Sequence, residues 1–595
     1  MMNCRALSQC FPWLDACSKA SHLDQIHAQV IAKGLSGDKR TSSVILHVCH
    51  KLLRSQSASR SKESGTSFGL YKQLLQCGAT PSGVTFSLVL KACSHLKAPG
   101  LVMGIHAQSL ALGFRYDSLV LNSLIHGYVA CELVGTAHEV FDELPDRDCI
   151  AWTELINGYA RSGCAEAVLD LFLRMMESDV RPDEFSIVAV CTAFSQFGSA
   201  SLARMAEGLA CKLGAMENSY VVNALIDMHG KCGSVSDAWE LFDGLPHKDV
   251  VSYNSMVAGF ARNGDMETAK TLFNRIPNKN EVSWSSLING YLQNDCFREV
   301  LNAYTEMIDD GRVVPNAAAI TCTVAACAHL GALDLGRKIH MNLDETKLCV
   351  DIVLSTALVD MYAKCGCISA ACALFGRIVQ KSEVSWNVMI MGLAIHGQAA
   401  ECLELFSEML KAGMKPTSTT FTGVLSACAH VGWLEVGKHY FEKMIKLYRI
   451  SPSPEHLCCM VHLLGRAGLI YEAFQLVRDS PHDPDAATWG ALLSSCRRHG
   501  YVELGDVIAR KILELEPYHS GAFVQLSSMF ASASKWREVQ EIRKIMKERG
   551  VQNRCGWSWF ELDGTVHEFV IGVNSHPRII DIYRVLQAID HHMNG

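Results

Sequence analysis

Few residues of this chain have the types and spacing that catalysis needs. A nucleobase deaminase activates a water on zinc, and its ligands and general base come from H-x-E and P-C-x-x-C sequences. Here His567 is followed directly by Glu568, and no C-x-x-C occurs among the 25 cysteines. The sequence also has no P-loop and no H-E-x-x-H, so it lacks the motifs that phosphate transfer and metalloproteolysis require. We therefore predict that the chain is not an enzyme and binds no metal or cofactor.

Two weaker matches to chemical motifs have simpler explanations. Residues 65–69 fit G-x-S-x-G, but a nucleophile elbow needs a buried strand before it, and the polar stretch 54–67 supplies none. Cys365 and Cys367 could hold a soft metal, yet few other ligands lie near them in sequence. Neither motif predicts a catalytic or metal site.

Composition excludes several other classes of protein. The chain is 49% hydrophobic and 19% charged, which is too apolar for a disordered protein. No apolar run is long enough to cross a bilayer, so we predict no membrane partner. The cysteines are scattered, often within predicted helices, which favours reduced thiols over a disulfide framework. A net charge of −7 leaves nucleic-acid binding open, because total charge can hide a local basic stripe.

The elements that must position any functional residue are short helices in tandem. Residues 219–249 and 250–280 are two copies of one pattern: an apolar stretch, a glycine-containing break, a second apolar stretch and a proline. In the first copy the apolar residues recur every three to four positions, at Val222, Leu225, Ile226 and His229, and again at Val235, Ala238, Trp239 and Phe242. Gly233 is suited to close the first helix, and Pro246 marks the end of the second. Neither helix can bury its apolar face alone, so the copies must stack.

Landmark residues extend this period along the chain. Trp152, Tyr253, Trp284, Trp386 and Trp489 are separated by 101, 31, 102 and 103 residues. The simplest segmentation has about 12 repeats of three alternating types over 83–485, starting at 83, 118, 149, 184, 219, 250, 281, 317, 352, 383, 418 and 454. The fold class that follows is all-α: an α-solenoid of helix-turn-helix repeats. The uniform period and signature of tetratricopeptide arrays are not seen.

These repeats resemble those of plant pentatricopeptide repeat (PPR) proteins of the PLS subclass. Residues 253–257 and 386–390, the Ala-Cys pairs and the Lys-Cys-Gly turns match its repeat types. Residues 486–562 look like the family's E motifs and 563–595 like an E-plus extension, while its DYW deaminase domain is missing. The resemblance implies a right-handed superhelix. Residues 1–20 carry a weak organellar transit signature, and 21–82 hold degenerate repeats and a polar loop.

The resemblance further implies that each repeat binds one base of single-stranded RNA through its fifth and last residues. Unpaired bases expose hydrogen-bonding edges that two or three side chains can read. For each of these residues taken alone, the alternative to base recognition is a structural role: Ser, Thr and Asn can cap helices, and Asp can end turns. The fifth residues are Asn122, Thr153, Asn223, Asn254, Ser285, Thr356 and Asn387, and their last-position partners are Asp148, Asp183, Asp249, Asn280, Asn316, Ser382 and Thr417.

By the family's rules, RNA running parallel to the chain would read U, G, any, U, C or U, A along the repeats from 118 to 316. Cys458 with Asp485 departs from the family's pairs. The family register puts the edited cytidine four nucleotides 3′ of the base facing repeat 454–485. The basic run from Lys535 to Arg549 is either a solvated helix face or a contact for RNA phosphate.

The function we expect is a sequence-specific RNA-binding factor that specifies organellar C-to-U editing sites. Its expected partners are single-stranded organellar RNA and, in trans, a DYW-type deaminase with editing accessory proteins. The expected compartment is the mitochondrion, with the chloroplast as the alternative. Two alternative functions remain: an organellar RNA processing, splicing or stability factor, and a protein–protein scaffold like tetratricopeptide arrays.

Overall fold

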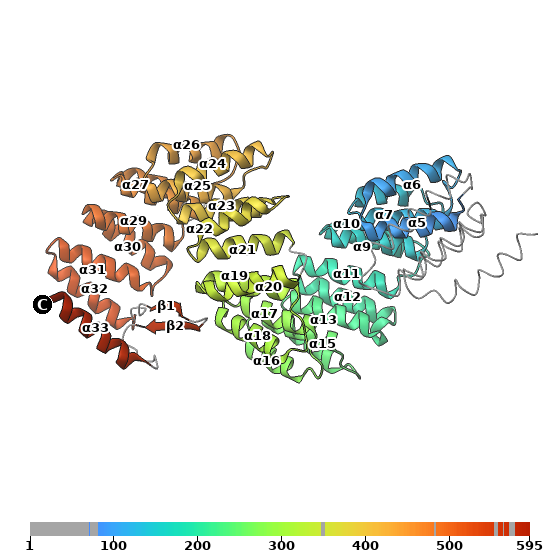
Figure 1. The fold of residues 1–595 in the computed structure, drawn as a ribbon, viewed down its shortest axis with the longest axis horizontal. Helices are drawn as coiled ribbons and strands as arrows, with labels where there is room; N and C mark the ends of the chain where they lie inside the picture. The colour runs from blue at the N-terminus through green and yellow to red at the C-terminus, as the bar shows by residue number, and fades with distance from the viewer. Residues whose placement is uncertain are drawn as a thin grey trace, which may run out of the picture. The chain divides into compact units, whose positions relative to one another are not determined.

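The computed structural model describes residue 71 and residues 81–346, 351–480, 484–551, 557–562, 565–570 and 578–594. Helical pairs follow one another in chain order (Figure 1). The first helices of the pairs are α5 (Gly83–Leu96), α7 (Ser118–Ala130), α9 (Cys149–Arg161), α11 (Glu184–Phe197), α13 (Ser219–Lys231), α15 (Val250–Arg262), α17 (Glu281–Gln293), α19 (Ala317–Leu330), α21 (Ile352–Lys364), α23 (Glu383–Ile395), α25 (Ser418–Val431), α27 (Pro454–Arg466), α29 (Ala486–His499) and α31 (Ser520–Ser532).

The second helices of the pairs are shorter on average and close each repeat. They are α6 (Pro99–Ala111), α8 (Val134–Asp142), α10 (Ala165–Glu177), α12 (Ala200–Lys212), α14 (Val235–Asp243), α16 (Met266–Arg275), α18 (Phe297–Asp310), α20 (Leu333–Thr346), α22 (Ile368–Arg377), α24 (Ala399–Lys411), α26 (Leu434–Lys446), α28 (Ile470–Arg478), α30 (Val502–Leu515) and α32 (Trp536–Glu548). A single 3₁₀ turn, η1 (Ala215–Glu217), precedes α13. This succession confirms the predicted α-solenoid of helix-turn-helix repeats. The first helices begin where the repeats counted from the sequence begin, while the division into named regions stays a prediction.

Local capping chemistry sets these helix boundaries. At the start of α15, the Asp249 carboxylate accepts hydrogen bonds from the Ser252 backbone, and the Ser252 hydroxyl lies 3.3 Å from the Asp249 backbone nitrogen. This capping box satisfies donors that the first turn would otherwise leave unpaired. After α13, Gly233 adopts φ +79, the left-handed conformation predicted for it. The same capping pattern starts α11 and α17.

Within each unit, the core consists of apolar side chains buried between neighbouring helices. In α13, Leu225, Ile226 and Met228 have no exposed surface. The backbones of α13 and α15 come so close at Gly230 that an added Cβ would lie 2.9 Å from the Gly259 Cα. Trp239 was predicted to be buried, but 37% of its surface is exposed. Its ring packs against Phe242 and Phe260. It lies on a second helix, where one side remains open to solvent.

The chain divides into two compact units, residues 1–278 and 279–595. The division falls after α16, so the helices up to α16 belong to the first unit and those from α17 to the second. Within each unit, successive first helices pack on one another, as α13 does on α15 and α23 on α25. Each unit is thus a stack in which every pair of helices contacts its neighbours.

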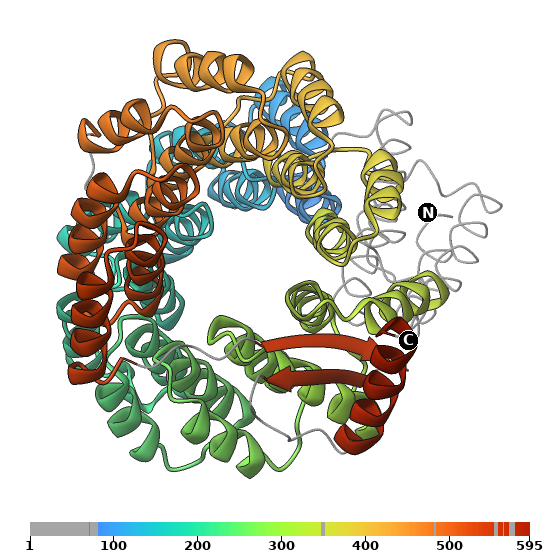
Figure 2. The same ribbon diagram turned by 90° about the vertical axis from the view of Figure 1, so that its left-hand side faces the viewer.

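The C-terminal region adds a small β-hairpin that the sequence did not lead us to expect. β1 (Trp557–Leu562) pairs antiparallel with β2 (Thr565–Val570), with Phe560 opposite His567. α33 (Ile579–Asn594) follows the hairpin (Figure 2). The fold remains a helical solenoid, with one two-stranded sheet among the described residues.

Several sequence features lie outside the described residues. These are the transit-like segment 1–20, the G-x-S-x-G match at 65–69 and most of the degenerate region 21–82. Among the described helices, none combines the length and apolarity that crossing a membrane requires.

Candidate nucleic-acid interface

The fifth and last residues of a repeat, about 30 positions apart in sequence, are brought together by the stacking of first helices. The last residue of one repeat is the N-cap of the next repeat's first helix, and within each unit it therefore lies beside the fifth residue of its own repeat. In four pairs the fifth residue donates directly to a carboxylate or amide oxygen of the last residue: Asn122 Nδ2 to Asp148 Oδ2 at 2.9 Å, Thr153 Oγ1 to Asp183 Oδ1 at 3.2 Å, Asn223 Nδ2 to Asp249 Oδ1 at 3.3 Å and Ser285 Oγ to Asn316 Oδ1 at 2.8 Å.

The remaining predicted pairs vary this arrangement. Asn387 Nδ2 donates to Thr417 Oγ1 at 3.2 Å. Thr356 reaches Ser382 only through a third hydroxyl, because Ser385 lies 2.8 Å from Thr356 and 2.9 Å from Ser382. For the pair divided between the two units, Asn254 is buried on α15, and Asn280 caps α17 through the Ser283 backbone.

The last-position residue has two roles at once. Asp249 Oδ1 accepts from the Ser252 backbone at 2.7 Å and from the Ser252 hydroxyl at 2.6 Å, besides its contact with Asn223. Burial raises the pKa of the Asp249 carboxyl, but the Ser252 and Asn223 hydrogen bonds outweigh it and the net pKa is lowered. Capping and pairing are therefore compatible: the cap fixes an ionised carboxylate beside the fifth residue.

The two members of a pair differ in how far they face solvent. Thr153, Asn223, Asn254, Thr356 and Asn387 are buried, with 6–8% of their surface exposed. The last-position residues are exposed or half-buried. Among the described residues, the covered Oδ1 atoms of Asn122 and Asn223 have no hydrogen-bond partner. A buried polar atom left unpaired costs about 1–3 kcal/mol, so these amides have hydrogen-bonding capacity that the protein does not use.

A recurring set of exposed apolar residues was missed by sequence reasoning. The second residue of a repeat lies one turn before the fifth on the same face of the first helix. In nine repeats it is a large apolar residue that is 48–69% exposed. The signal available in the sequence was the recurring apolar residue two positions after the N-cap, which is a valine in five of the nine repeats. These residues are Val84, Leu119, Ile150, Phe185, Tyr220, Val251, Val282, Val353 and Val384.

The candidate chemical motifs do not assemble into a site in the described residues. Cys365 and Cys367 flank the turn between α21 and α22, where Arg337 donates to the Cys367 sulfur at 3.4 Å. No group of three or more His, Cys, Asp or Glu side chains there is arranged to hold a metal. His567 and Glu568 are consecutive residues of β2.

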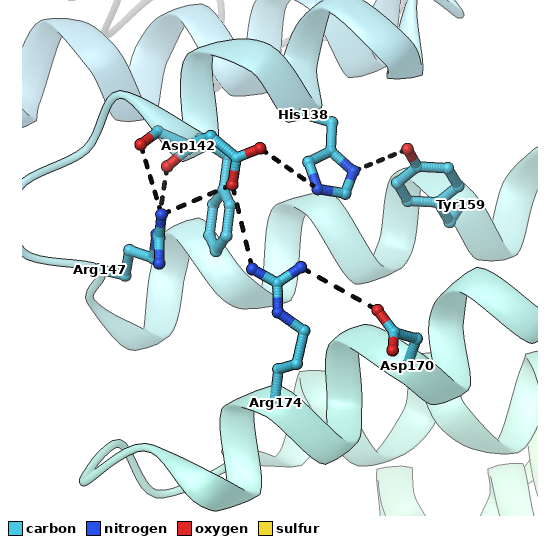
Figure 3. Close-up of polar contacts among 7 residues, drawn as sticks. His138, Asp142, Arg147, Tyr159, Asp170 and Arg174 are labelled. Atoms are coloured by element: carbon cyan, nitrogen blue, oxygen red, sulfur yellow. Dashed lines mark hydrogen bonds and ion pairs between the residues drawn. The ribbon is translucent and has the colours of Figure 1, made fainter.

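A polar cluster on α8, α9 and α10 has a structural explanation (Figure 3). His138 lies between Tyr159, whose hydroxyl is 2.8 Å from Nδ1, and Asp142, whose Oδ2 is 3.7 Å from Nε2. Arg147 and Arg174 also approach Asp142, at 3.5 and 4.0 Å. The groups come from neighbouring helices and satisfy one another, so the cluster joins successive repeats.

The fold and these polar pairs define a class of protein: a helical-repeat solenoid in which a polar pair recurs at the same two positions of several repeats. Models of the PPR repeat match residues 120–149, 150–180, 220–250, 251–280, 282–312, 353–382 and 419–448. A PPR repeat family model matches 381–430, and a model of the E motif matches 499–561. The matched repeats begin within two residues of the helix starts.

Two relatives from Arabidopsis thaliana agree with these matches. A mitochondrial pentatricopeptide repeat-containing protein of Arabidopsis thaliana is 38% identical over 609 residues, which cover 98% of this chain and 89% of the relative. A chloroplastic one from the same plant is 35% identical over 88% of this chain and 70% of its own length. A crystal structure of the maize pentatricopeptide repeat protein PPR10 has 18% identity and a TM-score of 0.48, covering 91% of this chain and 78% of that one. The chain belongs to the pentatricopeptide repeat family and carries an E motif.

Proposed function

We propose that this protein binds single-stranded RNA in an organelle and specifies sites of C-to-U editing by recruiting a DYW-type deaminase in trans. The observation that carries the proposal is the recurring polar pair, held in the same place in repeat after repeat. A row of such pairs can read a row of unpaired base edges, one base per repeat.

The exposed second-position residues complete the proposed site. An apolar side chain one turn from the polar pair can contact the face of a base while the pair reads its edge. Stacking of a base on a side chain is largely independent of sequence, so the second residue would supply affinity and the pair would supply selectivity. The reading residues we propose are the fourteen fifth and last residues predicted from the sequence.

Editing is the finer part of the proposal, and it rests on the E motif at residues 499–561. The chain contains no H-x-E with a matching P-C-x-x-C, so the deaminase would come from another protein. The relatives named above are mitochondrial and chloroplastic, which supports an organellar location. Between the two organelles, we propose the mitochondrion.

Two experiments test this function. First, the full chain should bind an RNA containing U, G, any base, U, C or U, A, and should not bind the same sequence in a duplex, whose base edges are already paired. Equal affinity for the duplex would refute base reading, and no affinity for either RNA would favour a protein scaffold.

The second experiment compares edited sites across organellar transcripts in plants with and without the protein. We expect editing to be lost at one or a few cytidines that follow the predicted sequence. Unchanged editing, together with altered transcript ends or introns, would instead favour a processing, splicing or stability factor.

A further inference from the structure

A third residue, supplied by the next helix, contacts the polar pair of repeat 383–417. The pair is Asn387 on α23 and Thr417, the N-cap of α25, and the third residue of α25 is Thr420. The Thr420 hydroxyl donates to Asn387 Oδ1 at 2.6 Å, and Asn387 Nδ2 donates to Thr417 Oγ1 at 3.2 Å. The oxygen of this buried amide is therefore engaged within the protein, whereas the bond to Thr417 uses one of the two N–H groups of its nitrogen.

The hydrogens available to these side chains fix the direction of their bonds. A hydroxyl has one hydrogen to donate and can accept twice. Thr417 Oγ1 accepts from Asn387 and lies 3.2 Å from Thr420 Oγ1, whose own hydrogen goes to Asn387. Within this group Thr417 therefore donates to Thr420, and the three side chains form a closed ring of hydrogen bonds. The ring needs a hydroxyl in the last position of the repeat, because that residue must both accept and donate.

An aspartate in the last position prevents such a ring. In repeat 219–249 the equivalent third residue is Ser252, and its hydroxyl donates to Asp249 Oδ1 at 2.6 Å. Asn223 Nδ2 donates to the same oxygen at 3.3 Å. An ionised carboxylate only accepts, so no hydrogen is passed on, and the covered Asn223 Oδ1 has no hydrogen-bond partner among the described residues. The last residue thus decides whether the hydroxyl of the third residue reaches the amide oxygen.

In repeat 118–148 the amide oxygen is open for a different reason. The third residue of the following helix is Ala151, which has no hydroxyl, and Asp148 caps that helix by accepting from the Ala151 backbone at 2.9 Å. In the part of the chain that the structure describes, Asn122 Oδ1 again has no hydrogen-bond partner. All three repeats have asparagine in the fifth position. They differ in whether a hydroxyl follows in the third position and in which group accepts its hydrogen.

We infer that Thr420 is a positioning residue that sets the base preference of repeat 383–417, and that its bond to Asn387 makes this repeat prefer cytosine to uracil. The inference rests on the proposed RNA-binding function and adds a third residue to the fifth and last. N3 of uracil carries a hydrogen and needs an acceptor, whereas N3 of cytosine is itself an acceptor. Asn122 and Asn223 have an open amide oxygen for uracil, whereas Asn387 has only its second N–H, which suits cytosine.

The test compares two RNAs that differ only in having cytosine or uracil opposite repeat 383–417, in the register of one base per repeat, bound to the full chain. The native protein should bind the cytosine RNA more tightly. Thr420→Val keeps the shape of the side chain but removes the hydroxyl, so Asn387 Oδ1 becomes available to uracil. The ratio of the two affinities should shift towards uracil by about fivefold, the effect of one neutral hydrogen bond. Thr420→Ser restores a hydroxyl and should restore the native ratio.

Ser252→Ala is the matched control, because it removes the hydroxyl in the same position of another repeat. The Ser252 hydroxyl donates to Asp249 and not to Asn223, so the ratio of cytosine to uracil affinity at repeat 219–249 should not change. Both substitutions remove part of a capping box, so circular dichroism checks that each variant is folded. The ratio of two affinities, unlike each affinity, does not depend on the fraction of folded protein, so a loss of stability alone leaves it unchanged.

The outcomes separate the role of Thr420 from the proposed function. An unchanged ratio in Thr420→Val, an equal shift in Ser252→Ala, or no preference for cytosine in the native protein would overturn the role of Thr420. Each of these outcomes leaves RNA binding by the fifth and last residues standing. No binding of either RNA by the native protein would overturn the proposed function together with this inference.

Discussion

Replacing Asn223 with threonine should change the base preferred by repeat 219–249 from U towards G while leaving the fold intact. The chain itself contains the geometry that the substitution would produce. In repeat 149–183, Thr153 lies 3.2 Å from Asp183 and 2.7 Å from Ser186. The residues equivalent to Asp183 and Ser186 around position 223 are Asp249 and Ser252, which form the same capping box.

The magnitude follows from the contacts that change. Asn223→Thr removes one amide–carboxylate bond of 3.3 Å, while Asp249 keeps its bonds of 2.7 and 2.6 Å from Ser252. The helix cap is therefore kept, and the main free energy that is lost is that of the contact between residue 223 and the RNA base. A matched contact of an amide with a base edge is worth about 1–3 kcal/mol, or roughly 5- to 150-fold in affinity.

The assay is fluorescence polarisation with two RNAs that differ only at the base facing this repeat. The variant should bind the U-containing RNA more weakly than the native protein does, and the G-containing RNA should restore binding. Thr153→Asn is the reciprocal control and should move its own repeat from G towards U. If Asn223→Thr weakens binding to both RNAs equally, Asn223 is a structural residue only and the reading assigned to this position is wrong.

Three further outcomes are expected. Gly230→Ala should lower the melting temperature, because its Cβ would lie 2.9 Å from the Gly259 Cα and overpacking costs about 1–3 kcal/mol. The control Gly100→Ala should leave the melting temperature unchanged, because no atom lies within 4 Å of its added Cβ. Equal effects of the two substitutions would contradict the close approach of α13 and α15. The pKa of Asp249 is lowered in the folded protein, because its hydrogen bonds outweigh the effect of burial. The ionised Asp249 therefore stabilises the fold above the pKa that it has in the unfolded chain, and this stabilisation is lost as the pH falls through its pKa in the folded protein. Ser252→Ala should therefore move the start of acid unfolding, followed by circular dichroism, to higher pH, and an unchanged or lower onset would refute this. Finally, the purified protein alone should convert no cytidine of its RNA to uridine, and product detected by sequencing without a partner would refute the absence of catalysis.

The positions of the helices could be predicted because their signals are local. A cap such as Asp249, a serine three residues later and a glycine such as Gly233 act within one or two turns of backbone. The stripe Val222, Leu225 and Ile226 also follows from helical spacing alone. The resemblance in motifs then placed the fifth and last residues, whose contact needs only that consecutive first helices stack.

Other features were decided by tertiary structure. Trp239 belongs to an apolar stripe, but its exposure depends on which helices cover the outer side of its repeat. The β-hairpin at 557–570 pairs two strands that no repeat period predicts. The apolar residues at second positions look like ordinary core residues in the sequence, but the stacking of the helices leaves them exposed to solvent.

The sequence by itself thus determined the helices and the repeat period, because both depend on interactions within a few residues. The electrostatic environment of the cavity between α25, α27 and α29 was decided only by stacking. His430, His462 and Arg498 are more than 30 residues apart from one to the next, and each alone reads as an exposed group near a helix end. Burial, together with the positive charges of His430 and Arg498, lowers the pKa of His462 because α25, α27 and α29 lie side by side. Burial and electrostatic interaction depend on distances between repeats, which local spacing does not contain.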